Sequence, residues 1–149
     1  MSTIEQSANE HLSQGIVPQL PYEDIAAAVE FLVKTFGFRE HEPGRISTSD
    51  GRVVHAEVRV GKSIIMLGTQ GGHGAYTPRS IGRASQILTV YIDDVDRHCE
   101  RARSAGAEII AEPKDEFYGD RVYEVEDLAG HRWRFHQHTG RTFDPPDAF

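Results

Sequence analysis

The sequence predicts an α+β domain made of two tandem βαβββ modules, in which eight strands form a mainly antiparallel sheet with helices on one side. The first observation behind this prediction is an internal repeat at an offset of about seventy residues. The second is a shared order in both copies, from a strand through a helix ending at glycine to paired strands. Neither unit can cover its own apolar face, so the halves are expected to pack together, and ligand sites tend to form where halves meet. The matched positions are Asp24, Glu30, Gly37, Arg52, Val53 and Gly61 in the first copy and Asp94, Glu100, Gly106, Arg121, Val122 and Gly130 in the second.

The first module begins after a polar, aperiodic segment. Residues 1–14 are expected to form a flexible or loosely docked extension before a strand near Ile16–Leu20. Asp24 is a suitable N-cap for a helix that ends at Gly37. The apolar residues of this helix recur at helical spacing; they are Ile25, Val29, Leu32 and Phe36.

Strands and a linker complete the first module, which is assigned to residues 15–68. After an extended segment near Phe38–Glu42, the sequence alternates strictly from Arg52 to Gly61 and predicts a half-buried strand. One face of this strand carries Val54, Ala56, Val58 and Val60, and the other carries His55, Glu57 and Arg59. A more apolar strand is expected at Ser63–Leu67. Residues 69–84 are rich in glycine, have no period and are interpreted as the linker between modules.

The second module is assigned to residues 85–138. It opens with a strand around Ile87–Tyr91 and continues with a helix from about Val95 to Ala105 that ends at Gly106. Further strands are expected near Glu108–Ala111, Arg121–Val125 and Arg132–Gln137, with a loop at Tyr118–Asp120. Residues 15–138 thus make a single domain. The tail, 139–149, is broken by prolines and is expected either to be free or to lie on a neighbouring surface.

Composition excludes several classes of partner. The net charge is -7, from 16 Lys and Arg against 23 Asp and Glu, whereas nucleic-acid binding relies on clustered basic side chains. No apolar run approaches the roughly 18 residues of a membrane span, and the N-terminus lacks the pattern of a signal peptide. We therefore expect a cytoplasmic protein without nucleic-acid or membrane partners. The single cysteine, Cys99, excludes an internal disulfide, and its helical spacing predicts a buried core thiol.

Three segments resemble the vicinal oxygen chelate superfamily, which includes glyoxalase I, extradiol dioxygenases and bleomycin-resistance proteins. Pro21–Phe38 resembles its acidic turn and first helix, Val90–Ile109 the opening of its second module, and Tyr118–Phe135 its last hairpin. The resemblance covers about residues 16–138 and is closest to the metal-free, bleomycin-resistance-like members. It implies the glyoxalase/bleomycin-resistance fold, in which the strands curve into a cup that holds the ligand. It also implies a homodimer, because dimers are common in the family.

The resemblance also predicts that the family's metal centre is absent. Family metal enzymes take ligands from the first and last strand of each module, and those positions fall near Val17, Ile87, Ile65 or Met66, and Arg134. None of these side chains binds a cation, and the guanidinium at the last position, where family enzymes have Glu, repels one. We therefore expect no metal and no cofactor.

The histidines permit a different metal site. His136 and His138 are two residues apart on one strand and share a face, and His55 and Glu57 form a similar pair. A catalytic metal site needs about three protein ligands, and each pair guarantees only two. A frayed strand end at His138 and a solvated sheet edge at His55 are therefore the favoured interpretation.

The last strand allows its faces to be assigned. Trp133 and Phe135 should pack under a helix, which leaves Arg132, Arg134 and His136 on the concave side. An arginine there could hold a carboxylate or phosphate, or stack on a flat ring; the alternative for Arg134 is a salt bridge to a carboxylate such as Glu57. Other candidate ligand-binding residues are Gln19, Thr89, Tyr91, Phe117, Tyr118, Arg121 and Tyr123. Side chains alternate between the two faces of a strand, but alternation does not say which face is concave. Either Arg121 and Tyr123 or their neighbours Val122, Glu124 and Glu126 therefore face the cup.

Two functions follow from these residues. One is a metal-free binding protein that captures a small, aromatic or anionic molecule, as drug-sequestering members of the family do. The other is an enzyme of the glyoxalase type, a lyase, isomerase or dioxygenase, in which His55, Glu57 or His136 acts as acid or base. A purely structural or regulatory role is a third. The sequence contains no supported Ser/His/Asp arrangement and no dinucleotide-binding glycine motif.

Overall fold

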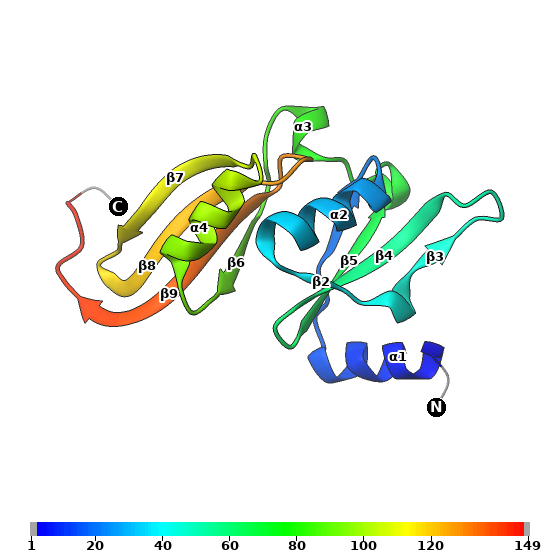
Figure 1. Ribbon diagram of the computed structural model, residues 1–149, viewed down its shortest axis with the longest axis horizontal. Coiled ribbons are helices and arrows are strands. Elements are labelled where there is room, and N and C mark those ends of the chain that lie inside the picture. The colour runs from blue at the N-terminus through cyan, green and yellow to red at the C-terminus, as the bar shows by residue number, and fades with distance from the viewer. Residues whose placement is uncertain (1–2, 148–149) are drawn as a thin grey trace.

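The computed structural model of the chain describes residues 3–147 and contains nine strands in two sheets (Figure 1). The first sheet has the order β1–β5–β4–β2, with β3 also paired to β4, and the second has the order β6–β9–β8–β7. The first sheet comprises β1 (Gln19–Tyr22), β2 (Arg39–Glu40), β3 (Ile46–Ser47), β4 (Val53–Val60) and β5 (Ser63–Thr69), and the second comprises β6 (Ile87–Tyr91), β7 (Glu108–Asp115), β8 (Tyr118–Glu126) and β9 (Arg132–Thr142). The helices are α1 (Thr3–Gln14), α2 (Ile25–Phe36), α3 (Pro78–Ile81) and α4 (Val95–Ser104), with the 3-10 helices η1 (Glu42–Gly44) and η2 (Gly72–Gly74). Within this described part of the chain, no helix is both long and apolar enough to span a membrane.

Both modules share one topology. In each, the first strand lies parallel to the last, β1 on β5 and β6 on β9, and the other pairs are antiparallel. A helix follows each first strand, α2 after β1 and α4 after β6, as a parallel pair of strands requires a long crossover. The predicted α+β class and the two βαβββ modules are confirmed. The strands differ from the prediction in forming two sheets rather than one of eight strands, and in including the short β3.

The helix starts follow from matching caps. The Asp24 carboxylate accepts a hydrogen bond from the backbone N–H of Ala27 at 3.0 Å, and Asp94 accepts one from Arg97 at 3.1 Å. Gly37, with φ of 75°, ends α2 in the left-handed region that favours glycine. These local signals explain why the sequence-based helix boundaries agree with the structure.

The two modules share a core at the C-terminal end of α2. Phe36 is buried, and its ring centroid lies 5.6 Å from that of Trp133 in the second module. His98 of α4 donates from Nε2 to the carbonyl oxygen of Phe36 at 2.8 Å, and Arg101 donates to that of Val33 at 3.2 Å. A cation at a helix C-terminus satisfies free carbonyls and complements the helix dipole. Helix α4 therefore caps α2 as well as covering its own sheet.

A second link between the modules is the buried carboxylate of Asp127, in the turn between β8 and β9. Its Oδ2 accepts hydrogen bonds from the hydroxyl of Tyr22 at 2.6 Å and from the indole of Trp133 at 3.1 Å. Its Oδ1 accepts from the backbone N–H groups of Ala129 and His131. Burial, reinforced by the Asp127 charge, raises the pKa of Tyr22 well above its ordinary value. One carboxylate thus joins β1 of the first module to the last hairpin of the second.

Residues 3–14 form helix α1 where a flexible or loosely docked extension was expected. The helix lies on the face of the first sheet opposite α2 (Figure 1). The side-chain amide of Gln14 accepts from the N–H of Ile64 at 2.6 Å and donates to its carbonyl at 2.9 Å. His11 Nε2 lies 2.9 Å from Glu57 Oε1. Sequence analysis did not predict this helix because its contacts are polar, so the sequence lacks the apolar face that identifies an amphipathic helix.

The second sheet also extends beyond its predicted limits. Strand β9 continues to Thr142, which lies opposite Tyr118, so part of the expected tail belongs to the sheet. The loop expected at Tyr118–Asp120 is the start of β8. Polar residues fill both extensions, and strand prediction from apolar alternation ends where such residues begin.

We expect Asp127→Asn to destabilise the protein by about 3 kcal/mol, because an amide replaces a buried acceptor of four donors. Urea unfolding followed by tryptophan fluorescence measures the loss. Asp93→Asn is the matched control, since Asp93 is exposed, and its effect should stay within about 0.5 kcal/mol. Equal stabilities of the two variants would show that Asp127 does not hold the modules together.

Candidate functional site

The second sheet has one face covered by α4 and one open face. Trp133 and Phe135 are fully buried on the covered face. On the opposite face Ile87 and Tyr91 are 56% and 64% exposed. The predicted face assignment of β9 is therefore confirmed. We call this surface the open face; by strand register it comprises Ile87, Thr89 and Tyr91 of β6, Asp120, Val122, Glu124 and Glu126 of β8, and Arg132, Arg134, His136 and His138 of β9.

Asp120 is the centre of a hydrogen-bond network at one end of the open face. Its Oδ2 accepts from the hydroxyl of Tyr91 at 2.8 Å and from Nδ1 of His136 at 3.0 Å, and its Oδ1 accepts from Nδ1 of His138 at 3.1 Å. Burial alone would raise the pKa of Asp120, but the bonds from His136, Tyr91 and His138 outweigh it and hold the pKa below its ordinary value. The carboxylate is therefore ionised at neutral pH and fixes the imidazole of His136.

Aromatic rings surround His136. The ring of Tyr91 lies 5.2 Å from the imidazole between centroids, and that of Tyr118 lies 6.1 Å away at an interplanar angle of 28°. Phe117 contacts Tyr118 edge to face. The Nε2 atom of His136 is buried and has no hydrogen-bond partner. This end of the open face thus combines stacking surfaces with one unused polar atom.

The two arginines of the open face differ in their partners. Arg132 lies 3.5 Å from Glu124 and 3.1 Å from Glu126, so two carboxylates neutralise it. Arg134 has no ion-pair partner among the described residues, and its Nε is buried without a hydrogen bond. The alternative salt bridge between Arg134 and Glu57 is not formed. Arg134 is therefore the guanidinium of this face that remains available to an anion.

A groove of about 880 Å³ runs beside the open face, between the modules. Its walls include the β4–β5 hairpin from Arg59 to Ile65, the segment from Phe36 to Arg39, and β6 with the residues that follow it, Leu88 to Asp93. Thr89 and Tyr91 belong to both the groove and the open face. The volume is in the range of small-molecule sites.

The other predicted pair, His55 and Glu57, lies on the first sheet beneath α1. The Glu57 carboxylate is 2% exposed and contacts Nε2 of His55 at 3.0 Å and of His11 at 2.9 Å. The pair therefore does not converge with His136 and His138, which lie on the second sheet. Within residues 3–147, no group of three or more His, Cys, Asp or Glu side chains is arranged to hold a metal ion.

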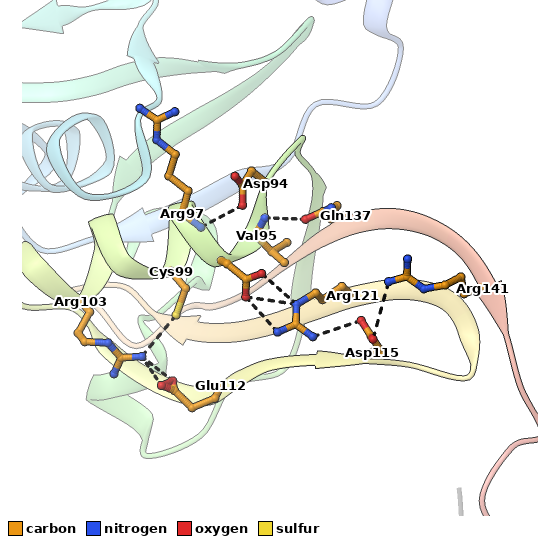
Figure 2. Close-up of polar contacts among 11 residues, drawn as sticks. Asp94, Val95, Arg97, Cys99, Arg103, Glu112, Asp115, Arg121, Gln137 and Arg141 are labelled. Atoms are coloured by element: carbon orange, nitrogen blue, oxygen red, sulfur yellow. Dashed lines mark hydrogen bonds and ion pairs between the residues drawn. The ribbon is translucent and has the colours of Figure 1, made fainter.

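Arg121 lies on the covered face of the second sheet. Figure 2 shows its guanidinium against α4 and β7, where it contacts Asp96 at 3.0 Å and Asp115 at 3.2 Å. Cys99 lies nearby on α4 and is 1% exposed, which confirms the predicted buried thiol. Burial raises the pKa of this thiol.

Two more candidates lie away from the open face. Tyr123 is fully buried under α4 and donates its hydroxyl to Nδ1 of His98, and burial raises its pKa. Gln19 is on β1 of the first sheet, opposite Met66. The candidates that the structure does bring together, on the open face or at its border, are Thr89, Tyr91, Phe117, Tyr118, Arg132, Arg134 and His136.

Sequence analysis missed Asp120, which organises this surface. Asp120 follows Gly119, so the pair was interpreted as part of a loop. The sequence did contain a signal for its position. Asp120, Val122 and Glu124 are each two residues apart, and strand residues two apart share a face.

Comparison with known proteins agrees with the fold. The sequence model of the Glyoxalase/Bleomycin resistance protein/Dioxygenase superfamily matches residues 11–135. The chain belongs to this superfamily, which confirms the resemblance to the vicinal oxygen chelate proteins. An uncharacterized protein of Mycobacterium tuberculosis (strain ATCC 25618 / H37Rv), Rv0887c, is 32% identical over 131 residues, which are 85% of this chain and 76% of that protein.

Solved structures give the same fold. TioX from Micromonospora sp. ML1 is 34% identical, with a TM-score of 0.64 over 83% of this chain and 95% of that one. TnmS3, an antibiotic binding protein from Streptomyces sp. CB03234, is 21% identical, with a TM-score of 0.63 over 83% of this chain and 93% of its own. At that identity the likeness to TnmS3 shows the fold alone.

The network around Asp120 makes a spectroscopic prediction. The hydrogen bond to Asp120, with smaller contributions from burial and charge, raises the pKa of Tyr91. Asp120→Asn should therefore lower this pKa toward the ordinary value of about 10. Ultraviolet titration of each protein, with a Tyr91→Phe counterpart subtracted, isolates the phenol. The control, Asp96→Asn, removes a carboxylate on the covered face and should leave Tyr91 unchanged; an equal shift in both variants would contradict the network.

Proposed function

We propose that the protein binds a small aromatic or anionic molecule on the open face and in the adjoining groove, and that it sequesters this molecule without a bound metal. The observation that carries the proposal is Arg134, a half-buried guanidinium with no ion-pair partner among the described residues. A guanidinium in such a place gains from a carboxylate, phosphate or phenolate in a two-pronged contact.

The rings beside Arg134 favour a flat ligand. Thr89 lies in register with Arg134, and Tyr91 lies two residues further along β6, where its side chain is 64% exposed. Tyr118 is also partly exposed, so two aromatic faces are within the same surface as the cation. Tyrosines offer stacking area together with a hydroxyl that orients the ligand.

Antibiotics are the first ligand class to test. TnmS3, which shares the fold, is described as an antibiotic binding protein, and drug sequestration needs a site but no reacting group. A matching role for this chain is supported by its superfamily and by the open face.

We further propose that the protein acts in the cytoplasm as a homodimer in which a second copy covers part of the open face. Ile87 is 56% exposed there, and a copy seated beside it would close the ligand site from the other side. Ile87→Asp should therefore shift sedimentation velocity toward the monomer. Ile46→Asp is the matched control because Ile46 is equally exposed but lies on β3. A monomeric wild type, or equal behaviour of both variants, would contradict the dimer.

One observation favours an alternative, acid–base enzyme of the glyoxalase superfamily. Asp120 binds Nδ1 of His136 and leaves Nε2 without a partner, which is the arrangement of a general base held by a carboxylate. A lyase or isomerase step would use Nε2 to take a proton from the bound molecule. Recovery of the ligand separates the two functions: sequestration returns it unchanged, and an enzyme converts it at a rate that His136→Gln abolishes.

A thermal-shift screen of small aromatic antibiotics, α-keto acids and divalent metals tests the binding function, because a ligand of the folded state raises the melting temperature. For an anionic hit, Arg134→Gln should weaken binding about tenfold or more by calorimetry. Arg132→Gln removes the same group from an arginine that is already neutralised and should have a much smaller effect. Equal losses in both variants, or stabilisation by metals alone, would overturn the proposal.

A further inference from the structure

Glu57 is a buried carboxylate surrounded by three imidazoles from different parts of the chain. Its oxygens contact Nε2 of His11 on α1 at 2.9 Å and Nε2 of His55 on β4 at 3.0 Å. Nε2 of His41, which precedes η1, lies 3.9 Å from Oε1. Gly44 of η1 packs so closely that a Cβ there would lie 2.3 Å from Glu57 Cδ. Helix α1, η1 and β4 therefore meet at this one charge.

A second carboxylate enters the same cluster from α1. Glu10 Oε2 lies 3.0 Å from Nε2 of His41 but without hydrogen-bond geometry, and its Oε1 contacts Arg59. Of the other described charges on packed elements, Arg39 on β2 and Glu42 on η1 are exposed.

Proton uptake by the imidazoles strengthens the contacts of this cluster. Protonation of His11 turns its contact with Glu57 into a charge-assisted hydrogen bond between α1 and β4. Protonation of His41 places a cation beside both Glu10 and Glu57. Loss of these protons at higher pH therefore weakens the docking of α1.

Outside the cluster, the contacts that the structure describes for α1 are few. Gln14 bonds to the backbone of Ile64, and Leu12 is 79% exposed. A helix of 12 residues is marginal in water by itself. Loss of docking should therefore also unfold the helix.

We propose that α1 is a proton-controlled cover of the first sheet, docked near pH 6 and released as the pH rises through the range in which imidazoles lose their protons. Imidazole is the side chain whose ordinary titration falls between pH 5 and 8. Release exposes the face of β4 that carries His55, Glu57 and Arg59, which corresponds to the open face of the second sheet. The proposal concerns a different sheet and does not depend on the proposed function.

The acid limit of docking is set by Glu57. Burial would raise its pKa, but the hydrogen bonds from His55 and His11 outweigh burial and lower the pKa below its ordinary value of 4.5. A lowered pKa in the docked state stabilises docking above the ordinary value, and this contribution is lost as the pH falls through the lowered one.

Hydrogen–deuterium exchange of the full chain at about pH 6 and about pH 8.5 tests this cover. After correction for the intrinsic rates, protection of the α1 amides should fall about tenfold or more at the higher pH, while α2 serves as an unchanged internal reference. Equal protection of α1 at both values, or greater protection at the higher one, would overturn the proposal.

Variants locate the effect in the cluster. Glu57→Gln should leave α1 weakly protected at both pH values, because the charge that attracts the proton is gone. His11→Gln keeps an N–H donor to Glu57 but cannot gain a proton, so the pH-dependent fall should shrink. Glu30→Gln, an exposed change on α2, should retain the full fall. An undiminished fall in Glu57→Gln, or in His11→Gln if the first variant does not fold, would exclude the cluster as its origin.

Discussion

The arrangement of the two modules depends on the buried carboxylate of Asp127. It accepts hydrogen bonds from Tyr22 on β1 and Trp133 on β9, so one charge fixes the start of the first sheet against the last hairpin of the second. The contacts of α4 with the end of α2 add a second constraint. Together they hold β6 beside the β4–β5 hairpin and so define the groove next to the open face.

The repeated modules have kept one scaffold and differ in what covers it. Each sheet carries a carboxylate bound by histidines on the face away from its main helix, Glu57 in the first and Asp120 in the second. A buried carboxylate needs such donors to remain charged. Helix α1 supplies one of them to Glu57 and covers the first face, whereas Asp120 takes all three from its own module and leaves the second face open. The duplication thus provides two similar surfaces, of which one is available to a ligand.

Features that depend on local chemistry were predictable from the sequence. The caps at Asp24 and Asp94 and the alternation of Trp133 and Phe135 each involve neighbours in the chain, so helices α2 and α4 and one sheet face were correct. Helix α1 and the extended ends of β8 and β9 depend on polar contacts with distant residues and left no periodic pattern. For Arg121, the alternation of side chains along the strand was compatible with either face of the sheet. The ion pairs that fix its side are made with residues of α4 and β7. The role of Asp120 was not predicted for the same reason, because its three hydrogen-bond donors lie on other strands, β6 and β9.

The character of the open face follows from the contrast between two arginines of one strand. Arg132 and Arg134 point to the same side, yet Glu124 and Glu126 neutralise the first, and no described carboxylate pairs with the second. Arg134 also stands where the family resemblance places a metal-binding Glu. Exchange of a carboxylate for a guanidinium reverses the sign of the charge that the site attracts, from a cation to an anion. Desolvation strengthens this preference, because a half-buried cation without a partner gains more from an anion than a solvated one does. The proposed preference of the open face for an anionic ligand therefore rests on the neighbours of Arg134 as much as on Arg134 itself.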